Sequence, residues 1–244
     1  MTLTLAEIKS RYRNTFIGLI WVVLNPLIQF SVHALIFKFI LKINIERYYI
    51  FLLTGLLPWI YISQTINQSV NCMISHREAL LSFQIHPISI VVSKSIDNFI
   101  NFLIPFIALF FILLPIENYD FQGFIFLPVA MLMLLVSTTY ISVLLAILQV
   151  FFRDVQYVMT FLLSIMIFLT PIFYPKYLIP ESYQFLVDLN PFYAFIRTFK
   201  ASLWHFSYQD IFASLGFSSL FLIIIIAITT LTWRRLRNEF YLQI

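Results

Sequence analysis

Six apolar runs, each long enough to cross a lipid bilayer, take up most of this chain. The runs cover residues 19–41, 48–70, 96–114, 124–150, 155–174 and 211–233. A spanning helix needs about 20 mostly apolar residues with few charges. Because lipid offers the backbone no hydrogen-bond partners, such runs are expected to be helical. The sequence therefore predicts an all-α polytopic membrane protein with six transmembrane helices.

The composition excludes the soluble alternatives. Of the 244 residues, 61% are hydrophobic and only 11% are charged, against roughly 25% charged in an ordinary soluble domain. So few polar groups could not cover the surface of a soluble fold. The aromatic share of 18% is a separate feature, because Leu, Ile and Val serve lipid contact equally well. The aromatic rings therefore need a further explanation.

Basic residues at the two ends of the chain predict an orientation. Three precede the first run within residues 9–13, and three follow the last run within residues 234–237. The positive-inside rule places such ends in the cytoplasm, and an even number of spans puts both termini on one side. We expect a multi-pass protein of the cytoplasmic (inner) membrane with both termini cytoplasmic. The net charge of +4 then fits the membrane surface, with no nucleic acid as a partner.

Two segments outside the runs are expected to lie at the membrane surface. Residues 1–17 predict an amphipathic interfacial helix; the alternative is a charged leader that only sets orientation. The apolar side chains of this segment recur at helical spacing, at Leu5, Ile8, Tyr12 and Phe16. Residues 175–210 are rich in proline and aromatic residues, which favours short re-entrant outer helices. Simple interfacial anchoring by Tyr and Trp is the alternative for this outer loop.

The sequence lacks the motifs that catalysis or ATP binding would need. It holds no G-x-x-x-x-G-K-[ST] phosphate loop, no His-x-x-x-His zinc pair and no Gly-rich dinucleotide turn. The single cysteine, Cys72, allows no intrachain disulfide and no metal cluster. His33, in the middle of the first span, is expected to make an interhelical hydrogen bond rather than to relay protons. We therefore expect a conduit with no catalytic residue and no metal, whose energy source lies elsewhere.

Four short motifs follow one another along residues 9–200. They are the basic stretch 9–13 running into Gly18-Leu-Ile-Trp21 and Asn25-Pro26; Gly55-Leu-Leu-Pro58-Trp59; Phe152-Arg153-Asp154-Val155 with Thr170-Pro171-Ile-Phe-Tyr-Pro175; and Leu189-Asn190-Pro191-Phe192-Tyr193 with Arg197. In order, spacing and chain length, the sequence resembles the membrane subunit of ABC-type (ABC-2 superfamily) polysaccharide exporters. This group exports O-antigen, capsular polysaccharide and wall teichoic acid. Residues 82–89 are closer to the capsule-exporter style, so the class of polysaccharide stays open.

The resemblance implies a single ABC-2 type transmembrane domain over residues 1–244 that is a transport subunit, not an enzyme. Two copies would form a channel, and two copies of a separate ATPase would use ATP and Mg, so this chain would bind no cofactor. The substrate would be a polyprenyl-linked polysaccharide exported across the cytoplasmic membrane. An ABC-2 exporter of a lipid or drug is the alternative within the superfamily. A membrane-bound glycan-modifying enzyme is the alternative from a different class.

The resemblance also assigns roles to segments outside the spans. Residues 71–95 would form a cytoplasmic coupling loop that docks on the ATPase; the alternative is an amphipathic connector on the lipid surface. The candidate contacts in this loop are Arg77, Glu78, Phe83 and His86. Residues 175–210 would form an outer gate. The cytoplasmic turn of Arg153 and Asp154 has a simpler explanation as a topological anchor.

Two groups of residues are candidates for contact with the substrate. The basic side chains of Lys9, Arg11 and Arg13 could attract the lipid-diphosphate head of the carrier. Aromatic rings can stack on the C–H faces of sugars, and polar edges can bond their hydroxyls. The candidate channel-lining residues are Trp21, Phe30, Trp59, Tyr61, Gln64, Asn67, Phe168 and Phe173. For each of these, lipid contact or helix packing is the alternative.

Overall fold

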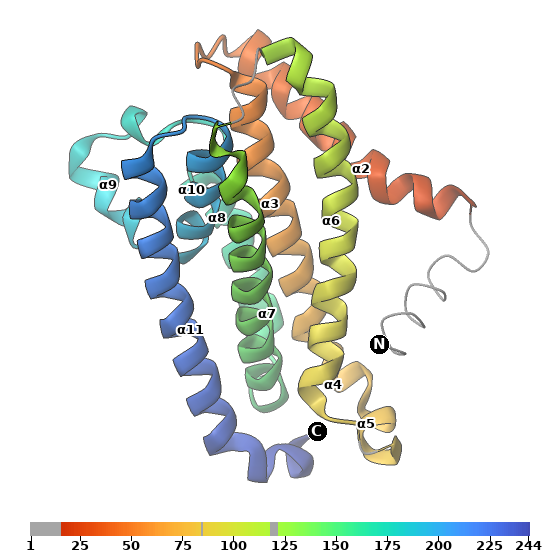
Figure 1. Ribbon diagram of the computed structural model, residues 1–244. Helices are drawn as coiled ribbons and strands as arrows, with labels where there is room; N and C mark the ends of the chain where they lie inside the picture. Colours follow the sequence, from red (N-terminus) through yellow and green to blue (C-terminus); the bar gives the residue numbers. More distant parts are fainter. Residues whose placement is uncertain (1–15, 84, 118–121) are drawn as a thin grey trace.

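The computed structural model describes residues 16–83, 85–117 and 122–244, and the regular elements within them are all helices (Figure 1). In chain order these are α2 (Phe16–Ala34), η1 (Leu35–Ile40), α3 (Tyr48–Val70), α4 (Cys72–Ser75), α5 (Arg77–Phe83), α6 (Pro87–Glu117), η2 (Gln122–Phe126), α7 (Leu127–Phe151), α8 (Val155–Leu169), η3 (Lys176–Leu178), α9 (Glu181–Asp188), α10 (Pro191–Leu203) and α11 (Tyr208–Gln243). The predicted all-α class is confirmed. The predicted interfacial helix over residues 1–17 lies almost wholly outside the described residues.

The long helices run between two ends of one bundle. The first end holds α4, α5, the turn from α7 to α8 and the C-terminus, and we call it the α5 end (Figure 1). The opposite end holds η2, the loop 41–47 and α9, and we call it the α9 end (Figure 1). Large apolar side chains cover the outside of the bundle, including Phe111, Phe161 and Ile223 at 66%, 65% and 64% exposure. This surface suits a lipid environment and would be unstable in water.

Helix α3 is the centre of the bundle. It packs against α2, α6, α7, α8 and α10, and its first fifteen residues are buried except for Tyr49. A helix that is apolar all round is expected at such a central position. Gly55 lies at a close approach, because a Cβ at this position would lie 3.1 Å from the backbone oxygen of Ile172. The glycine therefore lets the segment after α8 lie directly against α3.

Five of the described helical segments are long and apolar enough to span a membrane. They are Val23–Ile40, Tyr48–Val70, Pro87–Ile116, Gln122–Phe151 and Tyr208–Gln243. The apolar run 155–174 differs from the expectation of a full-length helix, because α8 ends at Leu169 after 15 residues. At about 1.5 Å per residue this helix is roughly 22 Å long, shorter than a hydrocarbon core of about 30 Å.

Pro171 explains the early end of α8. A proline disfavours helical geometry in the residue before it, and Thr170 is extended, with φ −93° and ψ 130°. Residues 170–173 are buried, and the Asn190 side chain donates a hydrogen bond of 2.8 Å to Thr170 Oγ1. Non-helical backbone is tolerated at membrane depth where protein covers it in this way. The chain therefore passes between the two ends through a short helix and a buried irregular segment.

Gly123 is a second close approach and yields a stability prediction. A Cβ on Gly123 would lie 2.0 Å from the backbone oxygen of Ser202, so η2 and α10 would have to separate. We expect Gly123→Ala to lower the melting temperature of the detergent-purified protein by several degrees, because overpacking costs about 1–3 kcal/mol. The control is Gly216→Ala, where nothing lies within 4 Å of the added Cβ. Equal melting temperatures for the two variants would contradict the packing.

Candidate functional site

A cavity of about 290 Å³ lies between α2, α3 and α6, and we call it the amide cavity. Its lining residues are Trp21, Asn25, Pro26, Leu57, Ile60, Tyr61, Gln64, Gln68, Asn98, Asn101, Phe102 and Pro105. Three of the predicted channel-lining residues, Trp21, Tyr61 and Gln64, therefore meet at one cavity. The helices that line it come from separate parts of the chain, so only the fold brings these side chains together.

Five side-chain amides give the cavity its chemistry. Each amide carries two donor hydrogens and an acceptor oxygen, and the aromatic rings beside them offer apolar faces. Asn98 is only 4% exposed, and its Nδ2 has no hydrogen-bond partner among the described residues. A buried donor left unpaired costs about 1–3 kcal/mol. The cavity is therefore suited to an occupant that combines hydroxyl groups with an apolar ring face.

The sequence analysis missed most of these amides. Gln64 and Gln68 stand four residues apart in α3, and Asn98 and Asn101 stand three apart in α6. Side chains at these spacings share one face of a helix. Two pairs of amides at helical spacing, inside otherwise apolar runs, are the signal that could have predicted a polar cavity.

A buried hydroxyl network fixes Tyr61 at the cavity wall. Its phenol oxygen lies 3.1 Å from Ser95 Oγ, which lies 2.6 Å from Thr139 Oγ1. These contacts join α3, α6 and α7. Hydrogen bonds between helices of this kind contribute about 0.6 kcal/mol on average in a membrane protein, and their main effect here is to set the position of the Tyr61 ring.

Polar side chains also lie exposed on the neighbouring faces of α3 and α8. Thr160 Oγ1 donates a hydrogen bond of 3.1 Å to Asn67 Oδ1, and both residues are exposed. Gln68 and Ser164 are exposed as well. Asn67 and Gln68 lie in the last turn of α3, and Thr160 and Ser164 lie inside α8. Polar groups inside apolar helices normally face protein or water rather than lipid. We call the group of Asn67, Gln68, Thr160 and Ser164 the polar strip.

The remaining candidate channel residues are divided between core and surface. Phe30, Trp59 and Phe173 are buried at 5%, 3% and 2% exposure, so within this chain they pack the core. The Trp59 ring meets Phe192 edge-on at 5.7 Å. Phe168, in contrast, is 65% exposed on α8.

The predicted interhelical hydrogen bond of His33 was wrong. Its Nδ1 lies 2.6 Å from the backbone oxygen of Gln29, one turn back in the same helix, so this bond is not interhelical. The contact between segments is made by the ring face instead, which stacks on Phe173 at 4.8 Å. Phe173 is available for this stacking because α8 has already ended and the irregular segment turns toward α2.

At the α5 end, α4 and α5 form a short helical turn with one buried and one exposed face. Leu80 is 2% exposed and packs in a cluster with residues of α6, α7 and α11, such as Ile147 and Phe240. Arg77 and Glu78 are exposed on α5. Leu81, which the sequence analysis did not single out, is 49% exposed beside them. The exposed face of α5 thus carries two charged side chains and one leucine.

Of the other two candidate coupling residues, His86 is exposed and its ring lies 5.6 Å from the Trp233 ring of α11. Phe83 is the last residue of α5. The candidate diphosphate ligands Lys9, Arg11 and Arg13 lie outside the described residues.

The turn between α7 and α8 is held by a glutamine that the sequence analysis missed. Gln149 is 3% exposed; its Nε2 donates to the Arg153 backbone oxygen at 3.0 Å, and its Oε1 accepts from the Gln156 backbone at 2.8 Å. The Arg153 and Asp154 side chains remain exposed at the α5 end. The turn is therefore rigid, with its two charges facing outward.

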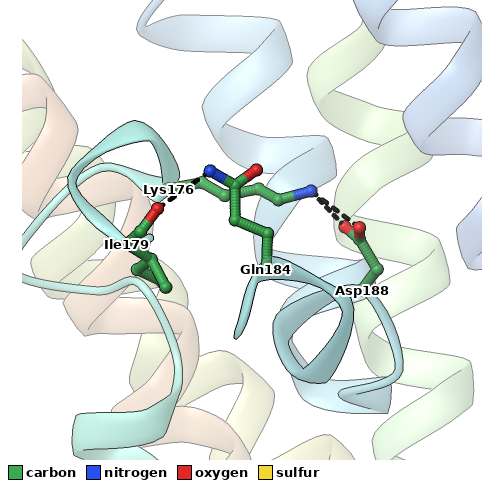
Figure 2. Close-up of polar contacts among 4 residues, drawn as sticks. All are labelled: Lys176, Ile179, Gln184 and Asp188. Carbon is green, nitrogen blue, oxygen red and sulfur yellow. Dashed lines mark hydrogen bonds and ion pairs between the residues drawn. The ribbon is translucent and has the colours of Figure 1, made fainter. Parts of the chain in front are cut away.

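At the α9 end, the segment over residues 175–210 is folded rather than loose. Lys176 Nζ donates to both carboxylate oxygens of Asp188, at 2.6 and 2.7 Å, and Gln184 Nε2 donates to the Ile179 backbone oxygen (Figure 2). Asn190 caps α10 by accepting from the backbone of Phe192 at 3.0 Å. The expected short outer helices are thus present as α9 and α10, and α10 packs against α3, α7 and α11.

The chain is similar in sequence to known membrane transport proteins. A family model described as ABC-2 type transporter matches residues 1–204. The chain is 28% identical over 216 residues to the O-antigen export system permease protein RfbA of Myxococcus xanthus, which covers 86% of this chain and 82% of that protein. It is 26% identical over 203 residues to a protein of the same description from Klebsiella pneumoniae, which covers 82% of this chain and 78% of that protein.

A further relative carries a different description. The chain is 24% identical over 193 residues to the polysialic acid transport protein KpsM of Escherichia coli, which covers 78% of this chain and 74% of that protein. The family model covers most of the chain and includes the amide cavity, the polar strip and the α4–α5 turn. The chain belongs to the ABC-2 type transporter family.

Proposed function

We propose that this chain is the channel-forming permease subunit of an ATP-driven exporter of a lipid-linked cell-surface polysaccharide. The relatives described as O-antigen export and polysialic acid transport proteins support a polysaccharide substrate. The chemistry of the amide cavity supports it independently, because amides and aromatic rings together match the hydroxyls and C–H faces of sugars. O-antigen, capsule and teichoic acid all share this chemistry.

The polar strip is the observation that best supports a channel formed between two copies of the chain. Asn67, Gln68, Thr160 and Ser164 are exposed in the single chain although they lie in apolar helices. A second copy of the chain facing this strip would enclose a polar path between the copies and remove the side chains from lipid. Helix α8 supports this arrangement, because Leu163 is its one buried residue and most of the remaining helix is free to pack elsewhere. A homodimer is therefore the proposed unit.

The α5 end is the proposed contact with a separate ATPase. The exposed face of α5, with Arg77, Glu78 and Leu81, is mounted on the bundle through the buried Leu80. A force on α5 would therefore reach α6, α7 and α11 through a packed cluster. This end would face the cytoplasm, since Arg234, Arg235 and Arg237 follow the last apolar run there. Two ATPase copies would bind ATP and Mg, and this chain would bind neither.

The overall proposal is tested in a strain from which this chain is deleted. We expect lipid-linked polysaccharide to accumulate at the inner leaflet and to return to the cell surface when the intact chain is supplied. Surface polysaccharide that is unchanged by the deletion would overturn the proposal.

One prediction of this proposal concerns the amide cavity. Asn98→Leu combined with Gln64→Leu removes two amides from the cavity wall, and we expect surface polysaccharide to fall at least several-fold. Protein level and ATPase copurification should stay normal, because both replacements are apolar residues within membrane helices. The measurement is quantitative detection of surface polysaccharide in the complemented deletion strain.

The control for the cavity variant is Gln243→Leu, an exposed amide at the last residue of α11. We expect full export from it. If the double cavity variant also exports at the intact level, the cavity is not part of the substrate path.

A second prediction of this proposal concerns the coupling surface. We expect Leu81→Asp to reduce copurification of the ATPase about tenfold, because a charge replaces an apolar contact worth roughly 1.5–3 kcal/mol. Leu178→Asp is the matched control, since Leu178 is 56% exposed against 49% for Leu81 but lies at the α9 end. Equal loss in both variants would show a general defect in folding and contradict a docking role for α5.

A further inference from the structure

A second pocket, at the α9 end, is chemically unlike the amide cavity. It has a volume of about 360 Å³, and we call it the basic pocket. Its lining residues are Phe51, Pro171, Pro175, Lys176, Tyr177, Gln184, Tyr193, Arg197, Lys200, Ala201, Trp204, His205 and Asp210. Three lysine or arginine side chains thus face one acidic side chain, among several aromatic rings.

Lys200 is the unusual residue of this pocket. It is only 6% exposed, and its Nζ donates to the Pro171 backbone oxygen and lies 3.4 Å from the centre of the Phe51 ring. An ammonium group has three donor hydrogens, and no carboxylate lies within 4.0 Å of Nζ in the described part of the chain. Burial lowers the pKa of this amine well below the usual lysine value, because the charged form loses its hydration.

Such a lysine is costly to keep. Moving an unpaired charge out of water costs several kcal/mol, and apolar replacement of buried charges is often neutral or stabilising. Within the fold, Lys200 has the Pro171 oxygen and the Phe51 ring as partners, but neither supplies a full counter-charge. An anion that enters the pocket would supply the missing counter-charge and would favour the charged form of Lys200.

The other charges of the pocket are consistent with an external anion. Lys176 is already neutralised by its two short bonds to Asp188 (Figure 2). Arg197 is half-buried, with its guanidinium 5.7 Å from the Phe217 ring, and it makes no ion pair among the described residues. Asp210 is exposed and likewise unpaired in that part of the chain. Arg197 and Lys200 are thus the two cations left for a ligand.

The aromatic residues of the pocket indicate the kind of molecule to which the anionic group is attached. Tyr177 is 66% exposed, and Trp204 packs edge-on against Phe51 at 4.7 Å, so both sit beside the two cations in the pocket wall. Aromatic rings stack on the C–H faces of sugars, and the planar guanidinium of Arg197 matches the two oxygens of a carboxylate or phosphate. Trp204 already packs within the fold, and the exposed Tyr177 is the ring that offers a free face to a sugar.

We propose that the basic pocket binds an oxyanion carried on a sugar, either the carboxylate of an acidic sugar or a sugar phosphate, through Arg197 and Lys200. The inference rests on the proposed function only in naming the exported polysaccharide as the source of that sugar. The pocket lies at the end opposite to α5, so it would receive the polymer as it leaves the membrane.

The test measures binding to the purified full-length chain in detergent. Trigalacturonate, glucose 1-phosphate, neutral maltotriose and glycerol phosphate are titrated while tryptophan fluorescence is followed, because Trp204 lines the pocket. We expect saturable binding of trigalacturonate or glucose 1-phosphate, and the tighter of the two identifies the source of the anion. Maltotriose and glycerol phosphate should bind at least about tenfold more weakly, a difference of about 1.4 kcal/mol.

Two variants and a control make the test specific. Lys200→Met keeps the length of the side chain and Arg197→Gln keeps its polarity, and each should weaken binding at least about tenfold. The control is Lys38→Met, since Lys38 also lies on an aromatic ring, 3.9 Å from the centre of Tyr49, but does not line the pocket. Should Lys200→Met fail to fold, Arg197→Gln alone decides the outcome.

Three results would overturn the inference. They are unchanged binding in both variants, equal binding of maltotriose, and equal binding of glycerol phosphate, which would assign the pocket to a lipid headgroup. The outcome is separate from that of the proposed function. A chain that binds acidic sugar through Lys200 but whose deletion leaves surface polysaccharide unchanged would defeat the export proposal and leave the pocket standing.

Discussion

The burial of α3 at the centre of the bundle is the constraint on which the rest of the structure depends. Helices α2, α6, α7, α8 and α10 pack against it, and Gly55 lets the irregular segment after α8 approach its backbone. Lipid provides little drive for helices to associate, so close packing around small residues and hydrogen bonds between helices must supply it. The amide cavity exists because α2 and α6 flank the polar half of this same helix.

Polar side chains are few in this bundle, and they fall into separate groups at distinct places. The hydroxyl network of Tyr61, Ser95 and Thr139 lies between helices, where it sets their register. The amides line a cavity, and the polar strip lies on a surface that a second copy would cover. The exposed charges of α5 lie at one end, and the cations of the basic pocket lie at the other. In the proposed transporter these would correspond to energy input, passage and exit.

Part of this architecture could be predicted because hydrophobicity is a local property. The second apolar run, 48–70, has the same bounds as α3, since composition and length alone define a buried helix. The end of α8 could also be predicted in principle, because Pro171 restricts Thr170 locally. The partner of His33 could not, because it depends on where Phe173 lies after the helix has ended. The isolation of Lys200 from carboxylates likewise depends on distances between separate segments.

The sequence by itself determined the solvent of this protein, the helical class, the positions of the apolar segments and the family resemblance. All of these follow from patterns within short stretches of chain, where periodicity and charge act locally. Only the tertiary structure decided which polar residues meet. Asn98 and Gln64 lie 34 positions apart, as do Tyr61 and Ser95, and Phe51 and Lys200 are far more distant in the chain. These residues come close together through the way the helices pack, because the apolar pattern of each helix specifies that it is buried but not against which partner.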